Sequence, residues 1–224
     1  EIYPTKNLRE KLYLVLVVSR TVEASKYIDD FRDFLRNLFM KFEGKLNLRV
    51  EAYQDITITV YPRDRDFGVQ FDKAYRVLGQ VPYKGSGNPF PALQKAIYSL
   101  IGQPGRRAIL MLAEPFEIKA YQQREWNRII NYAKANFIHI YTVCPGSSNS
   151  LKALSFGTRG KFFNLYTTVP GKLYRTLWET PVWEYVVVYE APYFKRSKGV
   201  WRDVLVSFRL GQLKGEDLVG YFTP

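Results

Sequence analysis

The sequence has few of the residues from which many common sites are built. It contains one cysteine, Cys144, and one histidine, His139, among 224 residues. A single cysteine cannot form an intrachain disulfide, and no Cys/His cluster is available for structural zinc. No apolar run approaches the roughly 20 residues that a membrane helix needs. These absences argue against a disulfide scaffold, a zinc-stabilised domain and a membrane-spanning helix in this chain.

Acidic residues are also scarce relative to basic ones. The chain has 33 Lys and Arg against 21 Asp and Glu, which gives a formal net charge of +12. The excess is spread out, and no block of like charge is evident. Such a surface favours solubility and weak attraction to nucleic acid, anionic lipid or acidic polysaccharide, without selecting among them. We interpret it mainly as a solvated basic surface.

Apolar residues make up 46% of the chain and aromatic residues 16%, enough to bury a full core. This composition excludes a disordered segment. The chain begins at Glu1 rather than Met. We therefore expect a processed product or a fragment, in which an upstream signal peptide or anchor would no longer be visible.

The most apolar stretch of the chain, Lys11–Ser25, predicts a central strand followed by a polar loop. Apolar residues occupy both faces of the strand, as in a parallel sheet that helices cover on both sides. A helix follows, because apolar residues from Tyr27 to Phe42 recur at three-to-four spacing. In open α/β sheets, ligands bind outside the carboxyl ends of the strands, so the loop Ser19–Ser25 is the expected place for chemistry.

Strands and helices alternate over the rest of residues 11–168. We predict strands at Leu46–Tyr53, Ile56–Tyr61, Ala108–Ala113, Ile138–Val143 and Phe162–Tyr166, and helices at Gln70–Leu78, around Leu93–Leu100, at Tyr121–Ala135 and at Ser150–Gly157. The first two of these strands form a hairpin around Gln54-Asp55, so one of them is an antiparallel edge strand. This order predicts an α/β fold with a Rossmann-like, doubly wound, mostly parallel sheet flanked by helices.

A different pattern begins near residue 169. A short helix at Lys172–Trp178 precedes strands at Tyr185–Tyr189 and Trp201–Leu210, and a basic loop connects the two strands. We interpret residues 169–224 as a C-terminal antiparallel β extension packed on the α/β domain through its aromatic residues. Residues 11–168 form that domain, and residues 1–10 are an N-terminal arm.

Local signatures accompany this order of elements. A buried strand enters a Ser-rich loop, a Gly-rich loop precedes Ala92-Leu93, and Leu151–Phe163 follows a strand. On these features residues 11–168 resemble a von Willebrand factor A-type (VWA) domain, whose Leu-x-x-Leu-(small)-x-x-Thr-Gly-Gly-(aromatic) segment is similar to Leu151–Phe163. The segments Tyr185–Tyr189, Trp201–Phe208 and Gly220–Pro224 resemble the tail of a bacterial, usually exported, subgroup of these domains.

The resemblance implies a metal-ion-dependent adhesion site at the strand ends. In that family an Asp-x-Ser-x-Ser motif, a Thr from the Gly-rich loop and a later Asp hold Mg²⁺ or Mn²⁺, which leaves one position open for a partner's carboxylate. The corresponding positions here are Val17, Ser19, Thr21, Gly87 and Glu114. Val17 and Gly87 offer no side-chain oxygen, so one carboxylate and two hydroxyls remain. We predict a degenerate site with no metal and no other cofactor.

Ser19 and Thr21, with Glu114 as a base, are the candidates for an enzymatic site. An enzyme of this kind needs the three side chains within hydrogen-bond reach in a pocket. The sequence contains no Gly-x-Ser-x-Gly elbow, and His139 lies in a strand pattern on the face opposite Ile138 and Ile140, where a structural role is favoured. We therefore predict no enzymatic activity.

Two further motifs are better explained by structure than by chemistry. The loop Gly85–Asn88 lacks the Gly-Lys-Ser/Thr ending of a phosphate-binding loop, so its glycines indicate a tight turn. No Lys, Arg or His near Cys144 indicates a lowered thiol pKa, so we expect a packed and inert thiol.

These patterns predict a non-enzymatic module that binds another protein or an envelope component without a metal, in an exported protein. The candidate contact residues are Ser19, Thr21, Ser86, Asn88, Glu114, Lys195, Arg196 and Lys198. Two alternatives stay open: a structural part of an envelope assembly, and a basic nucleic-acid-binding protein. The second is suggested by the cations between Tyr193 and Trp201, although a solvated hairpin tip would have the same sequence.

Overall fold

The computed structural model describes residues 2–4, 12–42, 46–64, 67–103, 105–178, 185–187, 201–210 and 213–222. The chain forms two compact units. One comprises Pro4–Glu184, and the other combines Glu1–Tyr3 with Tyr185–Pro224. The helix α6 (Pro170–Trp178) therefore belongs to the larger unit, together with the α/β elements.

A six-stranded sheet forms the centre of the larger unit, with the strand order β4-β3-β2-β5-β6-β7. Only β4 runs antiparallel, at one edge, and the other pairs are parallel. The strands are β2 (Leu12–Ser19), β3 (Leu46–Tyr53), β4 (Thr57–Tyr61), β5 (Arg106–Leu112), β6 (His139–Cys144) and β7 (Phe162–Asn164). The predicted α/β fold, with a mostly parallel sheet and one antiparallel edge strand, is confirmed.

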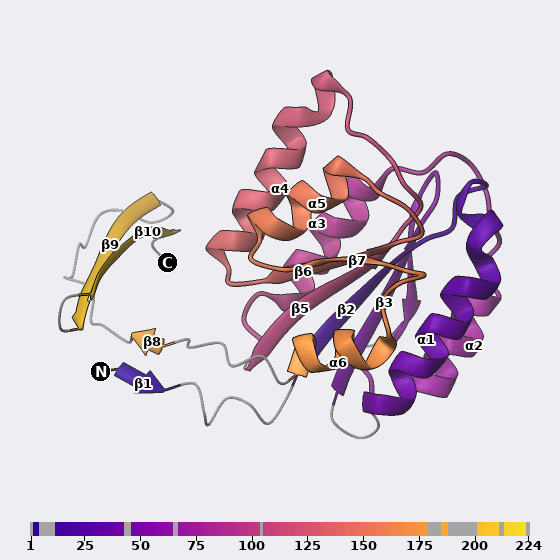
Figure 1. Ribbon diagram of the computed structural model, residues 1–224, viewed down its shortest axis with the longest axis horizontal. Helices are drawn as coiled ribbons and strands as arrows, with labels where there is room; N and C mark the ends of the chain where they lie inside the picture. The colour runs from indigo at the N-terminus through magenta and orange to yellow at the C-terminus, as the bar shows by residue number, and fades with distance from the viewer. Residues whose placement is uncertain are drawn as a thin grey trace. The chain divides into compact units, whose positions relative to one another are not determined.

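Helices cover both faces of the sheet (Figure 1). The face that carries Leu14 and Leu16 packs against α1 (Ile28–Phe42), α2 (Phe71–Gly79) and α6. The face that carries Val15 and Val17 packs against α3 (Pro89–Leu100), α4 (Gln123–Ala135) and α5 (Asn149–Gly157). Alternate residues of β2 thus enter two separate cores, which explains why this strand is apolar on both sides. Two short 3₁₀ helices, η2 (Ala24–Tyr27) and η3 (Ala120–Gln122), precede α1 and α4.

The starts of α3 and α5 are fixed by capping residues. Oδ1 of Asn88 accepts a 3.1 Å hydrogen bond from Phe90 N, and Pro89 occupies the first turn, where a missing N–H costs nothing. The hydroxyl of Ser148 accepts a 3.2 Å bond from Leu151 N. These caps set the two loops before α3 and α5 at the carboxyl edge of the sheet.

The smaller unit contains two strand pairs. β1 (Ile2–Pro4) pairs with β8 (Tyr185–Val187), and β9 (Trp201–Leu210) pairs antiparallel with β10 (Leu213–Phe222). The strand predicted at Trp201–Leu210 is confirmed at the same bounds. Its partner among the described residues is β10, which the sequence pattern does not indicate, rather than the strand near Tyr185. The packing of the extension on the α/β unit stays a prediction.

Candidate functional site

Three of the predicted site residues meet at the carboxyl edge of the sheet. β2 ends at Ser19, Thr21 follows it, and Glu114 comes two residues after β5. The Thr21 hydroxyl donates a 2.7 Å hydrogen bond to Oε1 of Glu114 and lies 3.3 Å from the Ser19 hydroxyl. Ser19 and Thr21 are 0% exposed, and Glu114 is 6% exposed. The structure therefore brings the three side chains together, but beneath the surface.

Tyr53 completes this group from the end of β3, and we refer to Ser19, Thr21, Tyr53 and Glu114 as the carboxyl-edge cluster. Tyr53 pairs with Ser19 in the β2–β3 register and is buried. Burial, and then the charge of Glu114, raise the pKa of the Tyr53 phenol well above its ordinary value. Among the described residues, neither the Tyr53 hydroxyl nor Oε2 of Glu114 has a hydrogen-bond partner. The strand pattern alone gives no sign that Tyr53 belongs to a site.

The positions expected to supply metal ligands do not form such a shell. Val17 is fully buried in the core beneath α3 and α4. Gly87 adopts φ +74°, and a Cβ there would lie 2.4 Å from Cγ2 of Thr21 and 3.3 Å from two ring carbons of Tyr53. A threonine at this position would therefore meet both an unfavourable backbone conformation and a clash. The described residues contain no group of three or more His, Cys, Asp or Glu side chains placed to hold an ion.

One carboxylate and two hydroxyls are a poor donor set for Mg²⁺ or Mn²⁺, which need several oxygen ligands and compensating negative charge. In addition, the Thr21 hydroxyl already donates to Glu114 and accepts a 3.0 Å bond from Ala24 N. The residues present therefore do not fit the ion that the VWA resemblance implies. Instead, the hydroxyl groups satisfy one another and the loop backbone.

Three loops above the cluster form one surface, which we call the three-loop surface: residues 20–25, 53–57 and 83–88. Backbone hydrogen bonds join Val22 N to Gly85 O at 3.0 Å, Lys84 N to Arg20 O at 2.8 Å and Asn88 N to Gln54 O at 3.1 Å. Val22 and Ile56 are 60% and 66% exposed on these loops. Sequence reasoning missed both residues, because single apolar residues within polar loops show no periodicity.

The predicted contact residues Ser86 and Asn88 lie exposed on the three-loop surface. Oδ1 of Asn88 is engaged as the cap of α3, so its amide nitrogen is the atom best placed for a partner. Gly85 and Gly87 adopt φ +68° and +74°. The prediction that these glycines form a tight turn is thus confirmed. Lys195, Arg196 and Lys198 lie outside the described residues.

Arg20 connects the three-loop surface to α2. Its Nη2 donates a 2.7 Å hydrogen bond to the carbonyl of Leu78, in the last turn of that helix. Its guanidinium carbon lies 4.5 Å from the centroid of the Tyr83 ring. Burial lowers the pKa of Arg20, although the side chain stays charged at any physiological pH. A buried cation that binds a helix carbonyl and stacks on an aromatic ring restricts the motion of both loops that it joins.

A fourth loop, residues 114–119, is held against the start of α5. The carboxylate of Glu117 accepts hydrogen bonds from Asn149 N at 2.8 Å and from the Ser150 hydroxyl at 2.8 Å. These bonds, that from Asn149 first, lower the pKa of Glu117. The Ser148 hydroxyl donates a 2.6 Å bond to the carbonyl of Phe116. The loop is therefore anchored at two points and does not form a free lid.

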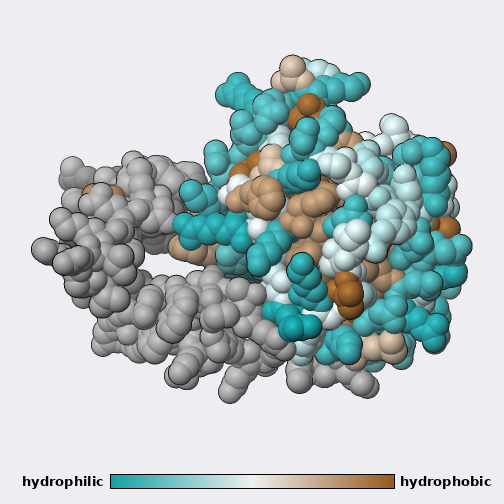
Figure 2. Space-filling view, in the orientation of Figure 1, coloured by the Kyte–Doolittle hydropathy of each residue, from teal (hydrophilic) through white to brown (hydrophobic). Residues whose placement is uncertain are grey.

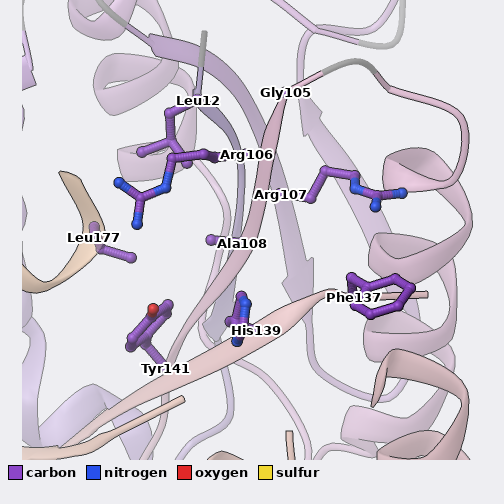
Figure 3. A pocket seen from close by; sticks show the side chains of 9 residues that line it. All are labelled: Leu12, Gly105, Arg106, Arg107, Ala108, Phe137, His139, Tyr141 and Leu177. Carbon is purple, nitrogen blue, oxygen red and sulfur yellow. The ribbon is translucent and has the colours of Figure 1, made fainter. Parts of the chain in front are cut away.

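A pocket opens at the opposite, amino edge of the sheet. Its walls include Arg106, Arg107, His139 and Tyr141 at the starts of β5 and β6. Figure 3 shows the two arginine side chains pointing to opposite sides of the pocket. The pocket lies at the far end of the strands from Ser19, Thr21 and Glu114. An enzyme of the kind considered above needs the three side chains in hydrogen-bond contact within a pocket. Ser19, Thr21 and Glu114 are in contact, and they are buried away from the pocket at the amino edge.

Cys144, at the end of β6, is fully buried and not in a disulfide. Burial, the largest cause, raises the pKa of its thiol. The predicted packed thiol is confirmed.

Among the described residues, no helix is long and apolar enough to cross a bilayer.

No known protein family matches the sequence, and no curated protein does. Solved structures do share the fold. A von Willebrand factor type A protein from Catenulispora acidiphila matches with a TM-score of 0.58 and 12% identity, over 76% of this chain and 42% of that chain. The SpRpn10 VWA domain matches with a TM-score of 0.57 and 12% identity, over 75% of this chain and 95% of that chain.

The PilB minor pilin from Streptococcus sanguinis, solved as a D319A mutant, matches with a TM-score of 0.56 and 9% identity, over 77% of this chain and 64% of that chain. This chain thus spans about two-fifths of the Catenulispora protein and under two-thirds of the pilin. At these identities the likeness concerns the fold. The α/β unit has the fold of a VWA domain.

Proposed function

We propose that this protein is a non-enzymatic binding module that contacts a protein partner through the three-loop surface, without a bridging metal ion. The observation that supports it best is the exposure of Val22 and Ile56 on loops that backbone hydrogen bonds hold together. Large apolar side chains on a preorganised surface gain binding energy without a large ordering cost. Ser86 and Asn88 supply polar contacts beside them.

The carboxyl-edge cluster supports this surface from below and does not contact the partner itself. Its hydroxyls are buried and bonded to Glu114 and to the loop backbone. A partner's carboxylate would find no open coordination position there. The proposal is therefore metal-independent binding by shape and apolar contact, and buried Ser19 lacks the access that a nucleophile requires.

Site-specific crosslinking tests this proposal. A photoreactive amino acid at Ile56 should capture one discrete protein from an extract of the source organism, and the double substitution Val22→Asp and Ile56→Asp should abolish binding of that protein. Val69 provides the control, because it is similarly exposed, at 59%, but lies away from the three-loop surface. It follows Gly68, which pairs with Leu48 near the start of β3, whereas the three-loop surface lies at the end of that strand. Equal capture at Ile56 and Val69, or binding that survives the double substitution, would refute the proposal.

We also propose an exported or envelope location, which the C-terminal resemblance suggests. One of the proteins that share the fold is a minor pilin. Fractionation of the source cells with an antibody against this protein should place it outside the cytoplasm. Recovery in the cytoplasmic fraction alone would contradict the proposed location and would argue against an envelope component as the partner.

A further inference from the structure

A long part of the chain lacks acidic residues, and it includes α4 and α5, which cover the same face of the sheet. Between Glu125 and Glu179 the sequence contains no Asp or Glu, although it contains seven Lys and Arg. This stretch forms most of α4 and all of β6, α5, β7 and α6. By contrast, α1 alone contains three aspartates. The basic excess of the protein is therefore concentrated on specific elements.

The centre of this region, on α5 and β7, is apolar and exposed. Phe156 on α5 is 64% exposed, and Phe162 on β7 is half-buried. Lys152 places its Nζ 5.5 Å from the centroid of the Phe162 ring, and it lies one turn before Phe156, on the same side of α5. Figure 2 shows an apolar area on this face, surrounded by hydrophilic residues. We call Phe156, Phe162 and the cations around them the α5–β7 surface.

Exposed cations form the rim of this surface. Arg159 and Lys161 follow α5 and are exposed. Lys134 lies on α4 one turn after Ile130, which packs against Gly157 of α5. On α1 and around η2, acids lie among the cations, and two ion pairs form there, Arg32–Asp29 and Lys26–Glu23, both at 2.6 Å.

The acids nearest to this surface are already engaged. Glu117 accepts bonds from the first residues of α5, and Asp30 accepts a 3.0 Å hydrogen bond from the Tyr166 hydroxyl beyond β7. Among the strands that the structure describes, β7 pairs only with β6, so the α5–β7 surface includes this end of the described sheet.

We propose that the α5–β7 surface binds an acidic polypeptide segment that carries an apolar side chain opposite Phe156. An apolar centre with a charged rim is the usual composition of a protein interface, and a rim of one sign selects a partner of the opposite sign. A polypeptide fits better than a nucleic acid. The surface is a helix face and a strand edge, whereas single strands bind in grooves with stacking platforms, and the described pocket lies elsewhere, at the amino edge. This surface is separate from the three-loop surface.

Fluorescence anisotropy on the full chain tests the proposal with three labelled probes: an amphipathic peptide of Glu, Ala and Leu of about 20 residues, the same peptide with Lys in place of Glu, and oligothymidine of similar length. The acidic peptide should bind, with an affinity that falls as salt rises, and the basic peptide should not. Preference for oligothymidine, or equal binding of both peptides, would overturn the proposal.

Variants locate the site. Phe156→Ser and the pair Lys152→Glu with Lys161→Glu should each weaken binding of the acidic peptide by at least about tenfold. The matched control is Met40→Ser with Lys41→Glu on α1, where Met40 is 63% exposed and Lys41 is also exposed. The affinity of this control for the acidic peptide should stay within about twofold of that of the unmodified protein. An equal loss in the control would overturn the proposal. Val22→Asp with Ile56→Asp should leave peptide binding unchanged, so failure of this inference and failure of the proposed function can be told apart.

Discussion

The Thr21 hydroxyl donates a 2.7 Å hydrogen bond to Oε1 of Glu114, and the two residues come from different strand ends 93 positions apart in the sequence. In VWA-type adhesion sites the corresponding positions hold a metal ion between them. Here the two side chains bind each other directly. Both residues are buried, so this bond helps to hold the loops after β2 and β5 together at the carboxyl edge.

Replacing Thr21 with valine should destabilise the protein, because the shape is retained while the hydrogen bonds of the hydroxyl to Glu114, Ala24 N and Ser19 are lost. The Glu114 carboxylate and the Ala24 N–H would be left without their partner, at a cost of about 1–3 kcal/mol in the free energy of unfolding. Urea denaturation measures this change. The same replacement at Thr167, which is exposed, should change the free energy by less than about 0.5 kcal/mol, and similar losses in both variants would contradict the role of Thr21.

A second buried carboxylate, Glu51 on β3, lies at the centre of a charged network under α3. Its Oε1 lies 2.7 Å from Nε of Arg49, its Oε2 lies 3.5 Å from Nζ of Lys95, and Thr59 donates to it at 3.0 Å. Glu51 is fully buried, whereas the Lys95 side chain is 43% exposed. Glu51→Ala should therefore cost about 3–5 kcal/mol, because Arg49 loses its buried counter-charge.

Lys95→Met is the matched comparison for the Glu51 network, since a half-exposed cation is screened by water and should contribute below about 1 kcal/mol. Both variants can be compared by urea denaturation. Equal effects of the two substitutions would show that burial does not determine the strength of this network.

Acidification should weaken the anchor of the loop 114–119. The Glu117 pKa is lowered below its ordinary value of 4.5 in the folded protein, so the carboxylate stabilises the fold at neutral pH. That contribution is lost as the pH falls through the lowered folded value. Glu117→Gln should reduce the melting temperature at pH 7 by about 1–2 °C, because the group is exposed, and the difference from the unmodified protein should shrink towards pH 3. A difference that is constant with pH would contradict the assigned hydrogen bonds.

The Cys144 thiol should react slowly in the native state. It is fully buried, and its pKa is raised, mainly by burial. A thiol-specific disulfide reagent at pH 8 should modify the native protein at least about tenfold more slowly than the urea-unfolded protein. Similar rates in both states would mean that the end of β6 opens readily.

The sequence predicts the α/β unit well where hydrophobic periodicity is strong. β2, the β3–β4 hairpin and α1 follow directly from the spacing of apolar residues, because those residues must reach one of two cores. β10 is missed, since Leu213–Phe222 combines two glycines with charged residues and shows no clear alternation. In that strand, pairing with β9 outweighs weak local propensity.

The site is only partly predictable, because its character depends on contacts between distant segments. The sequence places Ser19, Thr21 and Glu114 at one edge of the sheet, and the structure confirms that they meet. It does not reveal that they are buried, or that Tyr53 lies beside them, because a tyrosine at a strand end is ordinary in any β pattern. The α5–β7 surface is missed for a similar reason: its cations are scattered along the chain, so no run of like charge marks them.

Metal titration of the unmodified protein shows directly whether internal hydrogen bonds replace the ion at the carboxyl edge. The protein is stripped with a chelator, and its melting temperature and calorimetric heat are followed as Mg²⁺ or Mn²⁺ is added. An ion that binds only the folded state must raise stability by mass action, so a true site would shift the transition by several degrees at saturation. If internal hydrogen bonds replace the ion, neither a shift in melting temperature nor a heat of binding should be observed. A saturable rise in melting temperature that disappears in Thr21→Val would contradict it, and would make a metal-bridged acidic ligand the leading explanation of function.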